Sequence, residues 1–257
     1  MGAQRRRRRL YPVLGGAAAL IGVVVLFRAC AADDEPEPPH PTELGYPPAP
    51  EQILPEADQE HGDNVEGTPV AELADSVWLA ETGEATGIPQ RALAAYAGAA
   101  LHIDETQSDC RLGWNTLAGI GQVESVHGHF GGSTITDDGV VEPEIIGVPL
   151  DGSEGVMEIP DTDDGELDGD EEWDRAVGPM QFIPTTWERY AQDGNLDGET
   201  DVHQYDDAAL TAAVYLCDSA GDLTTDEGWN DAVTAYNQSV QYANDVADYA
   251  RRYSDSG

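Results

Sequence analysis

Residues 112–125, with the sequence LGWNTLAGIGQVES, form the stretch that decides the fold. On a helix, Leu117, Ile120 and Glu124 share one face, because residues three, four and seven positions apart lie on the same side. The apolar part of this face belongs in a core, so Glu124 stands where the apolar stripe ends. Partial burial raises the pKa of a carboxyl group, which lets a glutamic acid donate a proton near neutral pH. On position alone, a solvated glutamate at a helix end is the commoner explanation, so a catalytic role depends on two further motifs.

The first of these motifs covers residues 178–187, GPMQFIPTTW. A Gly-Pro turn, followed by a helix that starts with proline, predicts a rigid loop. Gln181 lies on this loop, and its amide offers donors and an acceptor for sugar hydroxyls and acetamides. The alternative is an ordinary loop with Met180 and Phe182 in the core.

The second motif is AYN at residues 235–237, with Tyr242 following. Tyr236 shares a helical face with Trp229, so a core position is one explanation for it. Asn237 is equally typical of a residue that ends a helix.

In this order, the three motifs resemble the lytic murein transglycosylases, in particular the actinobacterial branch of the membrane-bound lytic transglycosylase B family. The resemblance covers roughly residues 69–253 and implies a mainly α, lysozyme-like fold that acts on peptidoglycan. It implies that Glu124 is the catalytic residue. The substrate-binding positions that it implies are Ser125, Gly178, Met180, Gln181, Tyr236 and Asn237.

The same resemblance implies a mechanism that needs no cofactor. Glu124 protonates the glycosidic oxygen after a muramic acid unit and then, as a base, takes the proton of the C6 hydroxyl of that sugar. A 1,6-anhydro end results, and one carboxylate suffices because nucleophile and substrate are one molecule. Tyr236 stabilises the positive charge and Ser125 orients Glu124, while Gln181 and Asn237 hold the N-acetyl sugar.

Two other functions stay open at this stage. A hydrolytic muramidase on the same fold needs a second carboxylate to activate water, and this acidic chain has many. A non-catalytic wall-binding module needs none of the catalytic groups, so the presence of Glu124, Gln181 and Tyr236 argues against it.

Residues 193–201, DGNLDGETD, match the first half of a calcium-binding loop, with oxygen ligands at alternate positions and glycine at the sixth. The candidate ligands are Asp193, Asn195, Asp197, Glu199 through its backbone carbonyl, and Asp201. Position twelve holds Gln204 in place of glutamate, so Asp206 or Asp207 is the candidate closing ligand. An acidic turn without calcium is the alternative, because acidic chains match such patterns by chance.

Helical periodicity predicts a mainly α catalytic domain over residues 69–257. The expected helices begin near residues 69, 89 and 185 or cover residues 115–126, 207–219, 229–236 and 240–253. Residues 133–174 lack this period and hold short β-like pieces at 145–148 and 156–159. We expect them to form a small β-containing flap inserted into the domain. Within it, the acidic run 161–174 is a solvated face or, alternatively, a second cation site.

The segment before this domain has two expected parts. Arg5 to Arg9 precede an apolar run at residues 10–27, which predicts a cytoplasmic basic stub and a membrane anchor within residues 1–32. The alternative is a signal segment removed near Ala31. Residues 33–68 are rich in proline and acidic residues, which predicts a disordered, extended linker. The domain is therefore expected outside the cell, anchored to the plasma membrane.

The net charge of the chain indicates its partners, and its cysteines indicate a disulfide. The net charge is −38 with no lysine, which argues against nucleic acid or anionic lipid surfaces as partners. Peptidoglycan strands remain the expected partner, and we expect a monomer. Cys110 and Cys217 lie in the exported part, where disulfides form, so we predict that they pair; two free buried thiols are the alternative.

Overall fold

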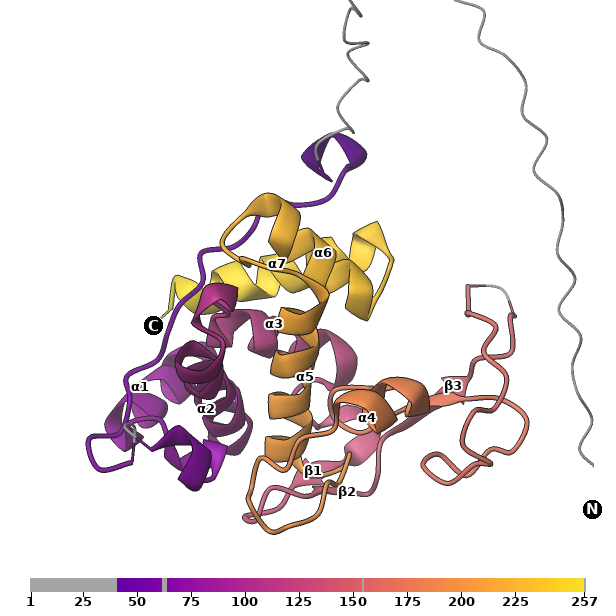
Figure 1. Ribbon diagram of the computed structural model, residues 1–257, viewed down its shortest axis with the longest axis horizontal. Helices are drawn as coiled ribbons and strands as arrows, with labels where there is room; N and C mark the ends of the chain where they lie inside the picture. Colours follow the sequence, from indigo (N-terminus) through magenta and orange to yellow (C-terminus); the bar gives the residue numbers. More distant parts are fainter. Residues whose placement is uncertain (1–40, 62–63, 154, 257) are drawn as a thin grey trace, which may run out of the picture. The chain divides into compact units, whose positions relative to one another are not determined.

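The computed structural model describes residues 41–61, 64–153 and 155–256. Within these residues the chain is mainly α, with short 3-10 turns and four short strands, so the predicted fold class is confirmed. The helices are α1 (Ser76–Thr86), α2 (Gln90–Thr106), α3 (Trp114–Ser125), α4 (Pro184–Tyr190), α5 (Tyr205–Ser219), α6 (Asp226–Tyr236) and α7 (Val240–Ser254). Figure 1 shows α5 in the middle of the body, with α1 and α2 on one side and α4 and the strands on the other.

The core forms around α3, the helix that carries Glu124. Its apolar face is fully buried, as Leu117 and Ile120 have no exposed surface. α3 packs most extensively against α7, and α2 packs against α5. Gly119 makes the close approach of α7 feasible, because a Cβ atom at this position would lie 2.7 Å from the carbonyl oxygen of Val246. The apolar stripe read from the sequence is therefore the contact face of α3.

The insertion at residues 133–174 contains β structure, as expected. β1 (Thr134–Ile135) pairs antiparallel with β2 (Val141–Glu142), and β3 (Ile146–Pro149) pairs antiparallel with β4 (Arg175–Val177). The expected β piece at 156–159 forms only an isolated bridge, from Glu158 to Asp151. In Figure 1 the segment after β3 extends away from the helical body, next to α4. We call residues 146–177, from β3 to β4, the flap.

The predicted disulfide is present. Cys110 and Cys217 are bonded, with their Cα atoms 5.5 Å apart across 107 positions of sequence. Cys110 ends the short 3-10 turn before α3, and Cys217 lies near the end of α5. The bridge therefore ties the entry of the Glu124 helix to the helix at the centre of the domain.

The linker prediction for residues 33–68 is wrong for a part of that range. Pro47 and Pro50 are buried against the domain, and Ala57 forms a β bridge with Ala74. The backbone N–H of Ile53 donates to Oδ1 of Asn115, at 3.0 Å. An extended segment has free backbone groups, and here side chains of the domain satisfy them. The proline-rich, acidic composition of the segment did not predict this packing, because composition carries no information about contacts with distant residues.

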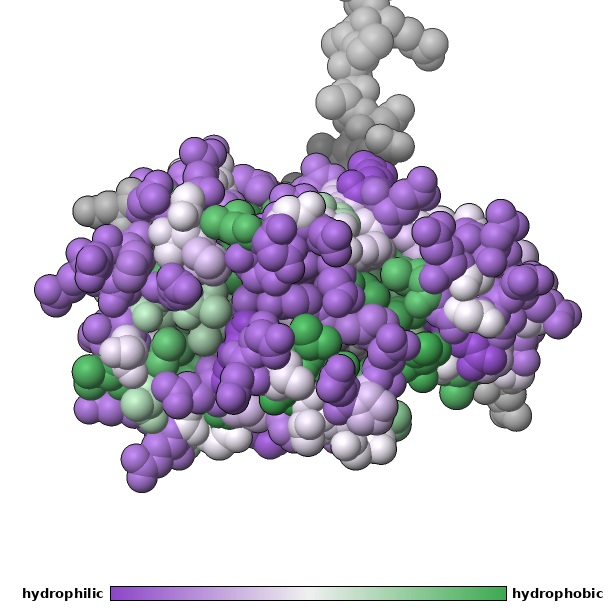
Figure 2. Space-filling view, turned by 90° about the horizontal axis from the view of Figure 1, so that it is seen from below, coloured by the Kyte–Doolittle hydropathy of each residue, from purple (hydrophilic) through white to green (hydrophobic). Residues whose placement is uncertain are grey.

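The predicted membrane span at residues 10–27 lies outside the described residues. Among the residues that the structure does describe, none of the helices has the length and apolar character needed to cross a bilayer. The face shown in Figure 2 is largely hydrophilic, with apolar residues in small groups between polar ones. A surface of this kind agrees with the acidic composition of the chain.

Candidate active site

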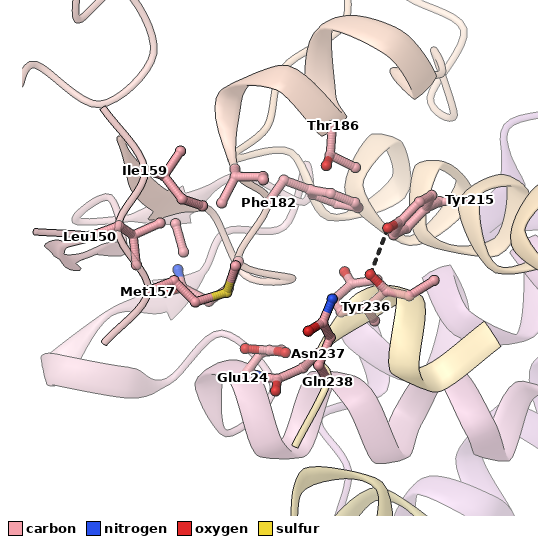
Figure 3. A pocket seen from close by; sticks show the side chains of 14 residues that line it. Glu124, Leu150, Met157, Ile159, Phe182, Thr186, Tyr215, Tyr236, Asn237 and Gln238 are labelled. Atoms are coloured by element: carbon pink, nitrogen blue, oxygen red, sulfur yellow. Dashed lines mark hydrogen bonds between the residues drawn. The ribbon is translucent and has the colours of Figure 1, made fainter. Parts of the chain in front are cut away.

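A pocket of about 250 Å³ opens beside the last turn of α3. Glu124 forms its floor, and the other walls come from the flap, from the turn after β4, and from α4, α5 and the end of α6. Figure 3 shows the side chains of the flap on one side of the pocket and those of α5 and α6 on the other. Segments distant in the sequence therefore converge on one carboxyl group.

Glu124 has the altered acidity that its position predicted. Burial raises the pKa of Glu124 to about 7, against the opposing influence of a hydrogen bond from Tyr242. The hydroxyl of Tyr242 donates to Oε1 of Glu124 at 2.6 Å. A group with this pKa is partly protonated at neutral pH, so it can first donate a proton and later accept one.

Tyr242 was noted in the sequence only as the tyrosine that follows the AYN motif, with no role in the site. It lies in the first turn of α7, where Ser239 caps the helix and accepts a hydrogen bond from its backbone N–H. Burial, and then the nearby charge of Glu124, raise the pKa of Tyr242 well above its ordinary value. The phenol therefore stays protonated and remains a donor. The sequence signal for Tyr242 is weak. It follows Tyr236 by six positions, but α6 ends between the two residues, so this spacing does not predict that they share a face.

Tyr236 lines the pocket, as the resemblance implied, but its hydroxyl is already engaged. It donates to the carbonyl oxygen of Met180 at 2.8 Å. Burial and the charge of Glu124 raise the pKa of Tyr236 well above its ordinary value. The ring and the acceptor lone pairs of the oxygen are thus the parts of Tyr236 left for a ligand.

Gly178 and Met180 shape the pocket and do not line it, which corrects their expected role in binding. A Cβ atom on Gly178, whose φ is +78°, would lie 2.1 Å from the carbonyl oxygen of Val202, so only glycine fits there. Met180 is fully buried. Gln181 does line the pocket, and its Nε2 donates to the carbonyl of Gly178 at 2.9 Å. The alternative of core positions therefore holds for Met180 and Phe182, which are both buried, while Gln181 remains in the lining of the pocket.

Ser125 does not line the pocket, so it is not placed for the substrate-binding role that the resemblance implied, whereas its hydrogen bonds fit the implied orienting role. It is buried, and its hydroxyl donates to the carbonyl oxygen of Pro179 at 2.6 Å. The hydroxyl oxygen of Ser125 in turn accepts from the backbone N–H of Gly128 at 2.8 Å. These bonds fasten the end of α3 to the turn that carries Gln181. Ser125 is therefore held away from the pocket, and its bonds fix the backbone next to Glu124.

Asn237 ends a helix and also lines the pocket. It is the residue that ends α6, and it is exposed at the pocket wall. Its Oδ1 accepts from the backbone N–H of Ser239 at 3.0 Å. This bond orients the side chain so that the amide NH₂ group is left as the donor for a ligand.

The loop at residues 193–201 holds its oxygen atoms by hydrogen bonds to its own backbone. Oδ2 of Asp193 accepts from Gly198, and Oδ1 of Asn195 accepts from Asp197. Of the two candidate closing residues, Asp206 pairs with Arg91. Asp207 instead lies under the loop.

Asp207 is buried and accepts the backbone N–H groups of Gly194 at 2.7 Å and Asp201 at 2.8 Å. Burial raises the pKa of Asp207 to about 6. Among the described residues, a set of three acidic side chains has ligand atoms within 4.8 Å of one another. This set lies in the acidic run of the flap and not in this loop: Asp161, Asp163 and Asp174. The loop contains carboxylate, amide and backbone oxygen atoms, which are the ligands that calcium prefers, and in this structure the side-chain oxygens accept hydrogen bonds from the backbone of the loop.

Residues 162–234 match the family model described as Transglycosylase SLT domain. This match includes the turn with Gln181 and ends before Tyr236, and Glu124 lies outside it. It supports a relationship with the lytic transglycosylase superfamily.

One similar solved structure is the Escherichia coli lytic transglycosylase Slt35 in complex with bulgecin A. The two chains are 14% identical, the similarity covers 68% of this chain and 77% of that one, and the TM-score is 0.41. A search of curated proteins found no match.

Proposed function

We propose that this protein is a peptidoglycan lytic transglycosylase, which cleaves the β-1,4 bond between N-acetylmuramic acid and N-acetylglucosamine and leaves 1,6-anhydro ends. The observation that carries the proposal is the solitary carboxyl group of the pocket. Among the described residues that line the pocket, Glu124 is the only aspartate or glutamate. A hydrolase that activates water needs a second carboxylate nearby, whereas an intramolecular attack needs one group that serves as acid and base.

The proposed reaction uses the two protonation states of Glu124. The protonated carboxyl group donates to the glycosidic oxygen as the bond to C1 breaks, and positive charge develops on the sugar ring. The resulting carboxylate accepts the hydrogen bond of Tyr242 and then takes the proton of the C6 hydroxyl, which attacks C1. This step restores the acid. The pKa of about 7 supports both roles near neutral pH.

Two amide side chains in the lining of the pocket, Gln181 and Asn237, suit an acetamide. Gln181 donates with its nitrogen to the protein, which leaves its oxygen as an acceptor for an amide N–H. Asn237 accepts with its oxygen from the protein, which leaves its nitrogen as a donor for an amide carbonyl. Together they offer one acceptor and one donor, the complement of the N-acetyl group on an amino sugar.

Product analysis tests the proposal. Purified full-length protein is incubated with peptidoglycan, and the released fragments are examined by mass spectrometry. We expect fragments with anhydro ends, lighter by one water than fragments with reducing ends. Reducing ends would indicate a muramidase, and strand binding without release would indicate a wall-binding module.

The proposal also includes an extracytoplasmic location of the enzyme and a calcium ion at residues 193–201. The basic stub and apolar run at residues 1–32 support an extracytoplasmic enzyme that is anchored to the plasma membrane. The proposal treats the enzyme as a monomer. Protease added to intact cells should degrade the domain. For the loop at residues 193–201 we propose structural calcium, on the strength of its donor types and spacing, with no part in the chemistry.

A further inference from the structure

The helix that carries Glu124 ends in a turn with a rare backbone conformation. Val126 and His127 follow α3 directly, with φ angles of +54° and +55°. This left-handed conformation is an outlier for a β-branched residue such as valine, and glycine is the usual residue for it at the end of a helix. A strained turn persists only where the surrounding structure holds it. The contacts of these two residues therefore decide whether α3 keeps its last turn.

His127 makes the contacts that hold this turn. The side chain of Val126 is exposed, whereas His127 is buried. The imidazole Nδ1 of His127 lies 3.1 Å from the hydroxyl oxygen of Tyr96 on α2, and its Nε2 lies 3.0 Å from the hydroxyl oxygen of Tyr253 on α7. The hydroxyl of Tyr96 also bonds to the hydroxyl of Tyr205 on α5. The turn is thereby connected to three helices of the core.

The packing of Tyr96 against α3 requires a glycine. A Cβ atom on Gly121 would overlap the hydroxyl group of Tyr96, so no other residue fits there without a shift of the tyrosine. The carbonyl oxygen of Gly121 accepts the backbone N–H of His127 at 2.9 Å. The turn thus closes onto the position of α3 at which Tyr96 packs.

The hydrogen bonds of this row run in one direction. Burial lowers the pKa of His127 to about 3, so the ring is neutral and has one donor and one acceptor nitrogen. The hydroxyl of Tyr253 donates to Oε1 of Gln122 at 3.4 Å, so it accepts from His127. Nε2 is therefore the donor, and Nδ1 accepts from Tyr96. Each group in the row has a single role, and the loss of one leaves its buried neighbours without a partner.

Tyr253 fastens α3 on both sides of the glutamate. Gln122 lies two positions before Glu124, His127 lies three positions after it, and the same hydroxyl bonds to both. Tyr253 belongs to α7, the helix that also provides Tyr242. The bonds of Tyr253 consequently fix the segment around Glu124 relative to the helix whose tyrosine donates to its carboxyl group.

We propose that His127 is a positioning residue for Glu124: it holds the turn that ends α3 and so keeps the carboxyl group in place for proton transfer. The inference rests on the proposed function and adds a residue to it. His127 does not line the pocket, so it acts through the backbone. A misplacement of about 1 Å can cost roughly 10²-fold in rate, so the loss of His127 should lower kcat. KM should change little, because Gln181 and Asn237 belong to other segments.

The test compares three full-length variants. His127→Phe keeps an aromatic ring and removes both hydrogen bonds, whereas His127→Gln restores a donor and an acceptor. The control is Asn115→Ala. Asn115 is equally buried, lies in the first turn of α3, and bonds to the backbone of Glu51 and Ile53. The kinetic constants for the release of peptidoglycan fragments are measured at a temperature at which circular dichroism shows every variant folded.

We expect His127→Phe to lower kcat about tenfold or more with KM within about twofold of the wild type, and His127→Gln to recover most of the loss. Asn115→Ala should lower the melting temperature and leave kcat unchanged. The inference is overturned if folded His127→Phe keeps the wild-type kcat, if the control loses as much, or if His127→Gln recovers nothing. If His127→Phe does not fold, Tyr253→Phe takes its place under the same criteria, because it removes one hydroxyl group and leaves the ring.

A crystal structure of the variant separates this inference from the proposed function. In His127→Phe, or in Tyr253→Phe in its place, Oε1 of Glu124 should lie beyond hydrogen-bond distance of the Tyr242 hydroxyl, from which it is 2.6 Å in the wild type. An unchanged distance overturns the inference. Absence of anhydro products from the wild type would refute the proposed reaction, and the comparison of the two structures would still decide the role of His127.

Discussion

At the scale of single residues, the acidity of Glu124 results from two opposing effects. Burial disfavours the carboxylate, and the hydrogen bond from Tyr242 favours it. The outcome is a pKa of about 7, which neither effect alone would produce. Both members of this pair can be changed without altering the volume of the pocket.

Glu124→Gln should abolish glycan cleavage while the fold and strand binding persist. The amide cannot transfer a proton, and each of the two proton transfers is typically worth 10²- to 10⁴-fold in rate. Turnover of peptidoglycan and circular dichroism measure the two properties on the same preparation. A folded variant with more than about a tenth of the wild-type rate would show that another residue provides the catalysis.

Tyr242→Phe should move the alkaline limb of the pH-rate profile to higher pH. The variant loses a donor that stabilises the carboxylate, so the pKa of Glu124 rises further above about 7. The acid form starts the reaction, and activity is lost as pH rises through that pKa. A higher pKa therefore preserves activity to higher pH, which a profile of kcat/KM against pH measures.

Tyr249→Phe is the matched control for this change. Tyr249 lies on the same helix, and its ring contacts Tyr253 and Arg252. Its variant should keep the wild-type profile. An alkaline limb in Tyr242→Phe that stays in place or moves to lower pH would contradict the role given to Tyr242.

At the scale of elements, the end of α3 and the turn after β4 act as one unit. Ser125 joins them through Pro179, and Tyr236 joins the end of α6 to the same turn through Met180. Gly178 makes the turn feasible because no side chain fits beside Val202. The carboxyl group of Glu124 and the turn that carries Gln181 are consequently held in a fixed position relative to each other.

Ser125→Ala should destabilise the protein and also lower kcat. The substitution leaves a buried carbonyl and a buried N–H without their partner, a loss of about 1–3 kcal/mol for each group. Ser133→Ala is the control, because Ser133 is equally buried and donates to Pro143, away from the pocket. Urea unfolding should show a loss of stability in both variants, whereas only Ser125→Ala should turn over more slowly. An unchanged kcat in folded Ser125→Ala would mean that the bond does not position Glu124.

At the scale of the whole molecule, electrostatic repulsion is the dominant constraint. A net charge of −38 opposes compaction, and salt or bound cations relieve it. The disulfide between Cys110 and Cys217 acts in the opposite direction, because it limits how far the unfolded chain can expand. Cation binding therefore belongs to the stability of the molecule as a whole.

Calcium should raise the melting temperature more than magnesium does at equal ionic strength. A cation bound only by the folded state stabilises that state by mass action, whereas screening acts equally for both ions. The variant Asp193→Ala with Asp197→Ala should lose the calcium-specific increment and retain the screening increment. Glu81→Ala with Glu84→Ala removes two exposed charges from α1 and should respond like the wild type. Equal responses to both ions, or a full calcium response in the loop variant, would leave the loop as an acidic turn.

Periodicity, motif order and compartment were enough to predict the mainly α class, the burial and raised pKa of Glu124, and the pairing of Cys110 with Cys217. These properties are readable in the sequence because they depend on residue spacing along one helix or on two cysteines in a segment that is expected outside the cell. The family resemblance of the ordered motifs implied that Gln181 and Tyr236 belong to the site, and both line the pocket.

Only the tertiary structure decided the partners of these residues. Tyr242 reaches Glu124 across 118 positions of sequence, and Ser125 turns away from the pocket towards Pro179. The position of Met157 in the pocket lining and the packing of the proline-rich segment on the domain have no periodic signal either. Contacts of this kind depend on which surfaces folding brings together, and spacing within a segment carries no information about a partner on a distant one.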